Sequence, residues 1–133
     1  MSDAKPSLGI FGAGWVGLVT GACFADLGHR VVIRDVVPER IEALRAGRVP
    51  FHEPGLTELI ERNRERLAFT LDLEELKADA TIFFACVDTP LTPSGEANLA
   101  PVWSVVEDLG APEGATLVMK STVPVGTGER IRA

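Results

Sequence analysis

Short apolar runs alternate along the chain with longer segments in which apolar residues recur every three or four positions. The apolar runs, rich in β-branched and aromatic residues, predict five strands, at residues 8–11, 30–34, 67–70, 81–87 and 116–119. The run at 81–87 is apolar on both faces, which is typical of a central strand covered by helices on each side. Strands that alternate with helices favour parallel pairing. The pattern therefore predicts an α/β protein with a doubly wound, mainly parallel sheet.

The intervening segments predict helices with recognisable starts and ends. The first helix should end at Gly28, and its predicted inner face carries the apolar residues Val16, Val19, Cys23 and Leu27. Further helices are predicted over residues 38–47, 54–66, 99–109 and from 124 to the end of the chain. The chain stops inside this last helix, at Ala133, which suggests that the sheet is truncated after its fifth strand.

A glycine pattern connects the first predicted strand to the first helix, in the order Gly12-Ala13-Gly14-Trp15-Val16-Gly17. The first glycine permits a tight turn, the second leaves room for a pyrophosphate beside the backbone, and the third lets the helix pack close to the strand. The phosphates would meet the N-terminus of the helix, where amide groups and the helix dipole favour negative charge. This context predicts a Rossmann-type dinucleotide site.

An acidic residue, Asp35, follows the second predicted strand, 18 residues beyond Gly17. A carboxylate at this place accepts hydrogen bonds from the ribose hydroxyls of NAD and repels the 2′-phosphate of NADP, so NAD is the expected cofactor. Arg34 and Arg40 lie near it, and either could bind a phosphate. The alternative is a glycine-rich turn without a ligand, with Asp35 capping the second helix.

Two further strand ends carry polar residues. Thr89 follows the fourth strand, and Ser121 and Thr122 follow the fifth. Ligands of open parallel sheets bind beyond the carboxyl ends of the strands, so these hydroxyl groups should face the cofactor. Ser121 or Thr122 could also cap the last helix, which is expected to open at Pro124.

Composition narrows the function classes. The 133 residues suit a single domain (1–133), and the net charge of −6 makes nucleic acid an unexpected partner. No apolar run reaches the ~20 residues that span a bilayer. Cys23 and Cys86 are the two cysteines, which predicts neither a disulfide framework nor a metal site, and favours the cytoplasm. Both are expected in the core.

Five segments together resemble the UDP-glucose/GDP-mannose dehydrogenase family, closest to its UDP-glucose branch. They run in family order through essentially the whole chain: residues 12–18, Asp35 with Arg40, residues 50–56, 87–91 and 120–127. The resemblance implies that NAD is bound by Gly12, Ala13, Gly14, Trp15, Val16, Gly17, Asp35, Arg40, Val87, Asp88, Thr89, Pro90, Leu91, Ser121, Thr122 and Val123. It also implies an auxiliary catalytic role for Thr122, near the reacting carbon, where it helps to hold a water.

The resemblance also implies an activity. The family oxidises the primary alcohol of a nucleotide sugar to a carboxylate, as in UDP-glucose to UDP-glucuronate, and reduces two NAD through a cysteine thiolate that in the family lies beyond residue 133. The chain alone is therefore expected to be inactive, to lack the substrate domain and to bind a UDP-sugar only with a downstream half. Homo-oligomers are a possible state.

Three residues depart from the family pattern. Trp15 stands where the family usually has tyrosine, Asp88 brings a negative charge near the phosphates, and Asn98 stands where aspartate is common. Residues 87–91 lean toward enzymes of UDP-N-acetyl-hexosamines, whereas residues 120–127 lean toward the glucose enzyme, so the sugar stays open. A stand-alone NAD-binding regulatory module and a two-domain dehydrogenase of a different family are competing hypotheses. The segment around Glu53 suggests a structural turn.

Overall fold

The computed structural model describes residues 5–132, so the predicted end of the last helix at Ala133 lies outside the described residues. Within that range one parallel sheet contains the strands β3 (Leu67–Thr70), β2 (Val31–Arg34), β1 (Leu8–Phe11), β4 (Ile82–Ala85) and β5 (Thr116–Met119), in this spatial order. The predicted parallel α/β architecture is confirmed. Three strands have the predicted bounds, whereas β2 and β4 are shorter than predicted.

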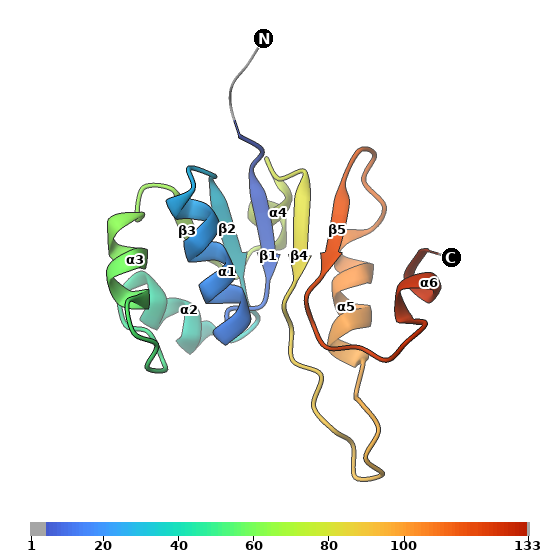
Figure 1. Cartoon of the computed structure of the whole chain (residues 1–133). Coiled ribbons are helices and arrows are strands. Elements are labelled where there is room, and N and C mark those ends of the chain that lie inside the picture. The colour runs from blue at the N-terminus through green and yellow to red at the C-terminus, as the bar shows by residue number, and fades with distance from the viewer. Residues whose placement is uncertain (1–4, 133) are drawn as a thin grey trace.

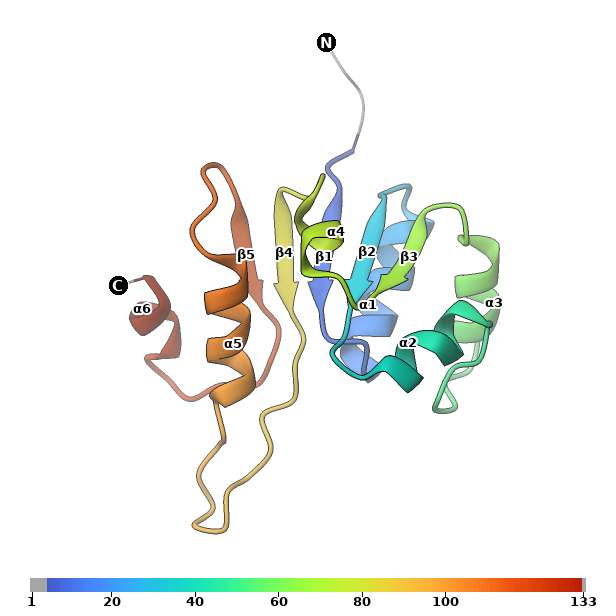
Figure 2. The same cartoon turned by 180° about the vertical axis from the view of Figure 1, so that it is seen from behind.

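Helices cover both faces of the sheet (Figures 1 and 2). Side chains of α1 (Trp15–Asp26), α2 (Pro38–Arg45) and α3 (Leu56–Arg62) pack in one apolar core. Those of α4 (Leu73–Lys77) and α5 (Ala100–Leu109) pack in a second core on the other face. A last helix, α6 (Thr127–Arg132), lies at the β5 side of the molecule. The doubly wound arrangement is thus confirmed.

Helix α1 buries a face that agrees only in part with the predicted one, since Val19 packs against the core but the other three predicted residues do not. Val16 and Leu27 are 47% and 60% exposed, and Cys23 is exposed, so its expected place in the core is wrong. The buried residues are mostly small: Gly17, Leu18, Gly21, Ala22 and Ala25. The reason is close packing, since a Cβ atom at Gly21 would lie 2.6 Å from Cδ1 of Ile33 on the sheet. Small residues are therefore needed where α1 approaches the sheet most closely, although Leu18 is also fully buried.

Three other predictions on helices need correction. The helix expected over 54–66 is shorter, and the one expected from Pro124 begins at Thr127. Helix α4 was not predicted, because five residues hold too little periodicity to mark a helical face. Its start is nevertheless local in origin, since the Asp72 side chain accepts a hydrogen bond from the Glu74 N–H at 2.9 Å.

The carboxyl edge of the sheet is where a ligand is expected to bind. All its strands run the same way, so their carboxyl ends meet at the lower edge in Figure 1. The chain turns from β1 to β2 on one side and reaches β4 on the other side of β1. Ligands of such sheets bind at this reversal of strand order. The glycine turn after β1 and the loop after β4 flank it.

Candidate dinucleotide site

The turn after β1 brings three backbone segments into close contact. Gly12 has a φ of +109°, a conformation that favours glycine, and a Cβ atom there would lie 2.5 Å from the Cys86 carbonyl oxygen. A Cβ atom at Gly17 would lie 1.8 Å from the Gly12 carbonyl oxygen. The turn and packing functions predicted for these two glycines are therefore confirmed.

Gly14 differs from its neighbours because its α-carbon faces open space. A Cβ atom built there meets nothing within 4 Å. The first backbone hydrogen bond of α1 joins the Leu18 N–H to the Gly14 carbonyl at 2.9 Å, so the amides just before Leu18 lie in the unpaired first turn. Open space beside a helix N-terminus is a cradle for an anion, and it fits a diphosphate.

The Asp35 carboxylate lies directly after β2 and is 8% exposed. Its Oδ2 accepts a hydrogen bond from the Ala13 N–H at 2.8 Å and pairs with Nη1 of Arg40 at 3.1 Å. Its Oδ1 accepts from the Val37 N–H at 3.0 Å, at the start of α2. Asp35 therefore ties the glycine turn to Val37, the residue before the second helix. Val37 is itself the N-cap of α2 and no side chain caps that helix, so the alternative in which Asp35 is only a helix cap is wrong.

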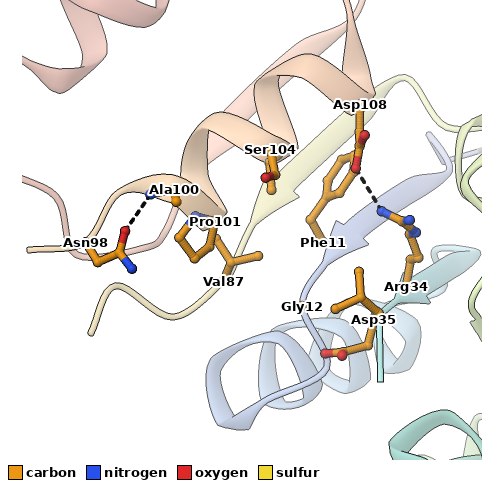
Figure 3. A pocket seen from close by; sticks show the side chains of 12 residues that line it. Phe11, Gly12, Arg34, Asp35, Val87, Asn98, Ala100, Pro101, Ser104 and Asp108 are labelled. Atoms are coloured by element: carbon orange, nitrogen blue, oxygen red, sulfur yellow. Dashed lines mark hydrogen bonds and ion pairs between the residues drawn. The ribbon is translucent and has the colours of Figure 1, made fainter. Parts of the chain in front are cut away.

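A pocket of about 390 Å³ opens beside Asp35, between the ends of β1 and β2 and helix α5 (Figure 3). Its walls are mostly apolar, and an ion pair between Arg34 and Asp108 lies at one side. The lining residues are Phe11, Gly12, Arg34, Asp35, Val36, Val87, Asn98, Ala100, Pro101, Ser104, Val105 and Asp108. The sequence does not reveal the α5 residues of this wall, because a helical period shows a buried face but not the crevice beside it.

A second pocket, of about 170 Å³, lies on the other side of the glycine turn and shares Val87 with the first. It is lined by Gly14, Trp15, Val16, Cys86, Val87, Asp88, Thr89, Lys120, Ser121 and Thr122. The structure thus gathers residues from three of the predicted segments in one place. They surround the mouth between β1, β4 and β5.

Hydroxyl groups hold the ends of β4 and β5 together in this pocket. Ser121 Oγ donates to the Val87 carbonyl at 2.7 Å, and Thr89 Oγ1 donates to the Thr122 carbonyl at 2.8 Å. The expectation that Ser121 or Thr122 caps the last helix is wrong, because that helix starts at Thr127. Thr127 instead turns its own hydroxyl to the Pro124 carbonyl at 2.7 Å.

Some predicted cofactor residues lie away from both pockets. Among those in the described part of the chain, six line neither pocket: Ala13, Gly17, Arg40, Pro90, Leu91 and Val123. Leu91 is 74% exposed and pairs with Ala97 in the long loop between β4 and α5 (Figure 1). Ala13 and Arg40 nonetheless contact Asp35 directly.

Sequence comparison agrees with this geometry. Residues 7–133 match the model of the UDP-glucose/GDP-mannose dehydrogenase family, NAD binding domain. The chain belongs to this family. It is an NAD-binding domain with a Rossmann-type fold, and the resemblance drawn from its five segments is confirmed.

Relatives within the dehydrogenase family are similar over nearly all of the chain. A UDP-glucose 6-dehydrogenase of Pseudomonas aeruginosa is 45% identical over 126 residues, which is 92% of this chain and 28% of the relative. The solved UDP-glucose dehydrogenase of Pyrobaculum islandicum has a TM-score of 0.86 and 39% identity, over 96% of this chain and 32% of its own. The GDP-mannose dehydrogenase of Pseudomonas aeruginosa has a TM-score of 0.87 and 34% identity, over 93% and 30%. The chain spans about a third or less of these dehydrogenases.

The tryptophan in the glycine turn has a partner that the sequence does not reveal. The Trp15 indole stacks on the Phe51 ring, with centroids 4.5 Å apart and planes within 6°. Phe51 belongs to the 50–56 segment, which leads into α3 through Gly55 at a φ of +84°. The structural turn expected there also braces the start of α1.

The two cysteines differ in chemical character. Burial raises the pKa of the Cys86 thiol to about 11, and the nearby Lys120 offsets this only in part. Cys86 is therefore protonated at neutral pH, and its predicted place in the core is confirmed.

Between residues 5 and 132, His, Cys, Asp and Glu side chains form no group of three that could hold a metal ion. No helix in the same range is long and apolar enough to cross a membrane.

Proposed function

We propose that NAD lies along the carboxyl edge of the sheet, across both pockets. The adenosine occupies the larger pocket beside Asp35, and the diphosphate crosses the Gly12–Gly14 turn. The nicotinamide enters the smaller pocket, near Thr89 and Ser121. The single observation that supports this most strongly is the pair of pockets that share Val87, of which the smaller is also lined by Gly14 with its open α-carbon.

Asp35 is the residue that selects the ribose. Its carboxylate has about four lone-pair directions. Three are taken by Ala13, Arg40 and Val37, two of them at Oδ2 and one at Oδ1. Oδ1 thus retains one direction for a ribose hydroxyl. A 2′-phosphate at the same place would meet the negative charge of the carboxylate.

The remaining predicted contacts have supporting functions. The first turn of α1, with Trp15 and Val16, bounds the nicotinamide end, and Asp88 and Leu91 belong to the loop after β4. Ala13 and Arg40 hold Asp35, whereas Pro90 and Val123 shape the strand ends. Thr122 is exposed, and its backbone carbonyl is fixed by Thr89, so its hydroxyl is available to the reacting centre as an auxiliary catalytic group.

The whole protein is proposed to be a nucleotide-sugar 6-dehydrogenase that converts UDP-glucose to UDP-glucuronate. NAD would accept the hydride, and two molecules of NAD would be reduced for each sugar oxidised. The described residues bind and orient the cofactor. They offer no suitable nucleophile, because Cys86 is buried with a raised pKa and Cys23 lies on the outer face of α1. The 133-residue chain by itself should therefore release no NADH from any UDP-sugar.

The domain assignment, partners and location follow the same reasoning. We treat residues 1–133 as part of one NAD-binding domain, with the UDP-sugar held jointly with a substrate domain, and with homo-oligomers as a possible state. Both cysteines are free, which suits the reducing cytoplasm.

Titration calorimetry with NAD and NADP tests the proposal. NAD should bind at least about tenfold more tightly, since charge repulsion at Asp35 costs NADP about 1.4 kcal/mol or more. Asp35→Asn should reduce this preference, whereas Asp72→Asn, which removes a carboxylate at the start of α4, should leave it unchanged. Equal affinity of the parent for both nucleotides would refute the ribose function of Asp35. Failure to bind either would refute the site.

A further inference from the structure

Two arginines flank the proposed ribose site. Arg34 is the last residue of β2, directly before Asp35, and Arg40 lies in α2. In dinucleotide-binding folds, an arginine near the ribose accommodates the 2′-phosphate of NADP. Free arginines at these two positions would therefore work against selection of NAD.

The structure pairs each arginine with a carboxylate. Arg40 is held by Asp35 itself at 3.1 Å. Arg34 reaches across the pocket to α5, where its Nη1 lies 3.0 Å from Oδ2 of Asp108 (Figure 3). Its Nε donates to the Leu71 carbonyl at 3.3 Å, so the guanidinium is fixed at two points.

The Arg34–Asp108 pair belongs to the wall of the adenosine pocket. Both residues line it together with Asp35, and their side chains are 17% and 37% exposed. The charge of a partly buried pair is screened less than that of a surface pair. The two ion pairs, Arg34–Asp108 and Arg40–Asp35, each sum to zero, and the ammonium of Lys77 lies nearby, where it donates to the Asp108 carbonyl at 3.1 Å. Removal of one carboxylate would leave a net positive charge.

We propose that Asp108 is a specificity-determining residue for the cofactor. Its carboxylate holds Arg34 and cancels its charge, so that no cation is available to a 2′-phosphate. This inference rests on the proposed NAD site and adds a second component to its selectivity. Asp35 repels the additional phosphate, and Asp108 removes the cation that would attract it.

The test compares NAD and NADP binding to Asp108→Asn by calorimetry. We expect NADP affinity to rise about fivefold while NAD affinity stays within about twofold, because the freed Arg34 acts on the phosphate in a partly exposed pocket. Glu107→Gln is the matched control, since it removes one carboxylate from the adjacent position of α5. It should leave the ratio unchanged. Adding Arg34→Met to Asp108→Asn should abolish the gain.

The outcomes separate this inference from the proposed function. If the parent prefers NAD and folded Asp108→Asn keeps the same NAD to NADP ratio, Asp108 only ties α5 to β2, and the inference is wrong while the NAD site stands. If the parent binds neither nucleotide, the site itself is wrong. Should Asp108→Asn fail to fold, Arg34→Met alone decides. An unchanged ratio of NAD to NADP affinity supports the inference, because it means that Arg34, held by Asp108, does not contact the 2′-phosphate. If Arg34→Met weakens NADP binding about fivefold or more, Arg34 already binds the 2′-phosphate in the parent, and the inference is overturned.

Discussion

The contact between α1 and the turn after β1 makes Gly17 a position where one methyl group should cost much stability. A Cβ atom at Gly17 would lie 1.8 Å from the carbonyl oxygen of Gly12 and 2.9 Å from its carbon. Ordinary contacts begin near 3.4 Å, and distances under 3.0 Å essentially never occur. Gly17→Ala therefore requires the two backbones to separate by roughly 1.2 to 1.6 Å.

The expected cost follows from two opposing terms. Overpacking of a tight interior costs about 1–3 kcal/mol, and the upper end applies because the obstacle is a backbone carbonyl that cannot rotate away. Alanine in place of glycine in a helix returns about 1 kcal/mol. The net loss in free energy of unfolding should be about 2 kcal/mol, which for a domain of this size lowers Tm by roughly 6–10 °C.

Urea unfolding followed by circular dichroism measures this loss. The matched control is Gly128→Ala in α6, where an added Cβ atom meets nothing within 4 Å. That variant should be neutral, or more stable by up to about 1 kcal/mol. Parent-like stability of Gly17→Ala, or equal losses in the two variants, would refute the close approach of α1 to the turn.

Three further predictions concern Gly14 and the two cysteines. Gly14→Val should abolish NAD binding, because the side chain fills the diphosphate cradle, while it costs at most about 1 kcal/mol in urea unfolding. Below pH 9, an alkylating reagent should modify exposed Cys23 in the folded protein and spare Cys86 until the chain unfolds. The pKa of Cys86 is raised from 9.0 to about 11 by folding, so its contribution to stability is complete below pH 9 and is lost as the pH rises toward 11. Cys86→Ala should flatten that alkaline decline in urea titrations.

The sequence by itself determined the strands, the glycine turn and the acidic residue after β2. These signals are local. Short β-branched runs fix the strands, a positive φ needs Gly12, and Asp35 follows a strand end whose direction the alternating pattern already implies. The family resemblance could be recognised from the sequence for the same reason, because each of its segments is a short, continuous stretch of the chain.

Only the tertiary structure decided which face α1 buries. Hydrophobicity favours Val16 and Leu27 inside, yet the close approach of α1 at Gly17 and Gly21 requires residues without side chains at those points, so close packing outweighs the hydrophobic pattern. That distance depends on side chains of another element, Ile33 among them, and no periodicity within α1 records it.

The tertiary structure also decided the partners of the charged and aromatic groups around the site. Arg34 and Asp108 are 74 residues apart, and Trp15 and Phe51 come from different segments of the chain. Each side chain taken alone is compatible with many partners, and only the order of strands brings these together. Sequence specifies such groups one at a time, whereas a pocket is defined by distances between segments that the folded sheet alone sets.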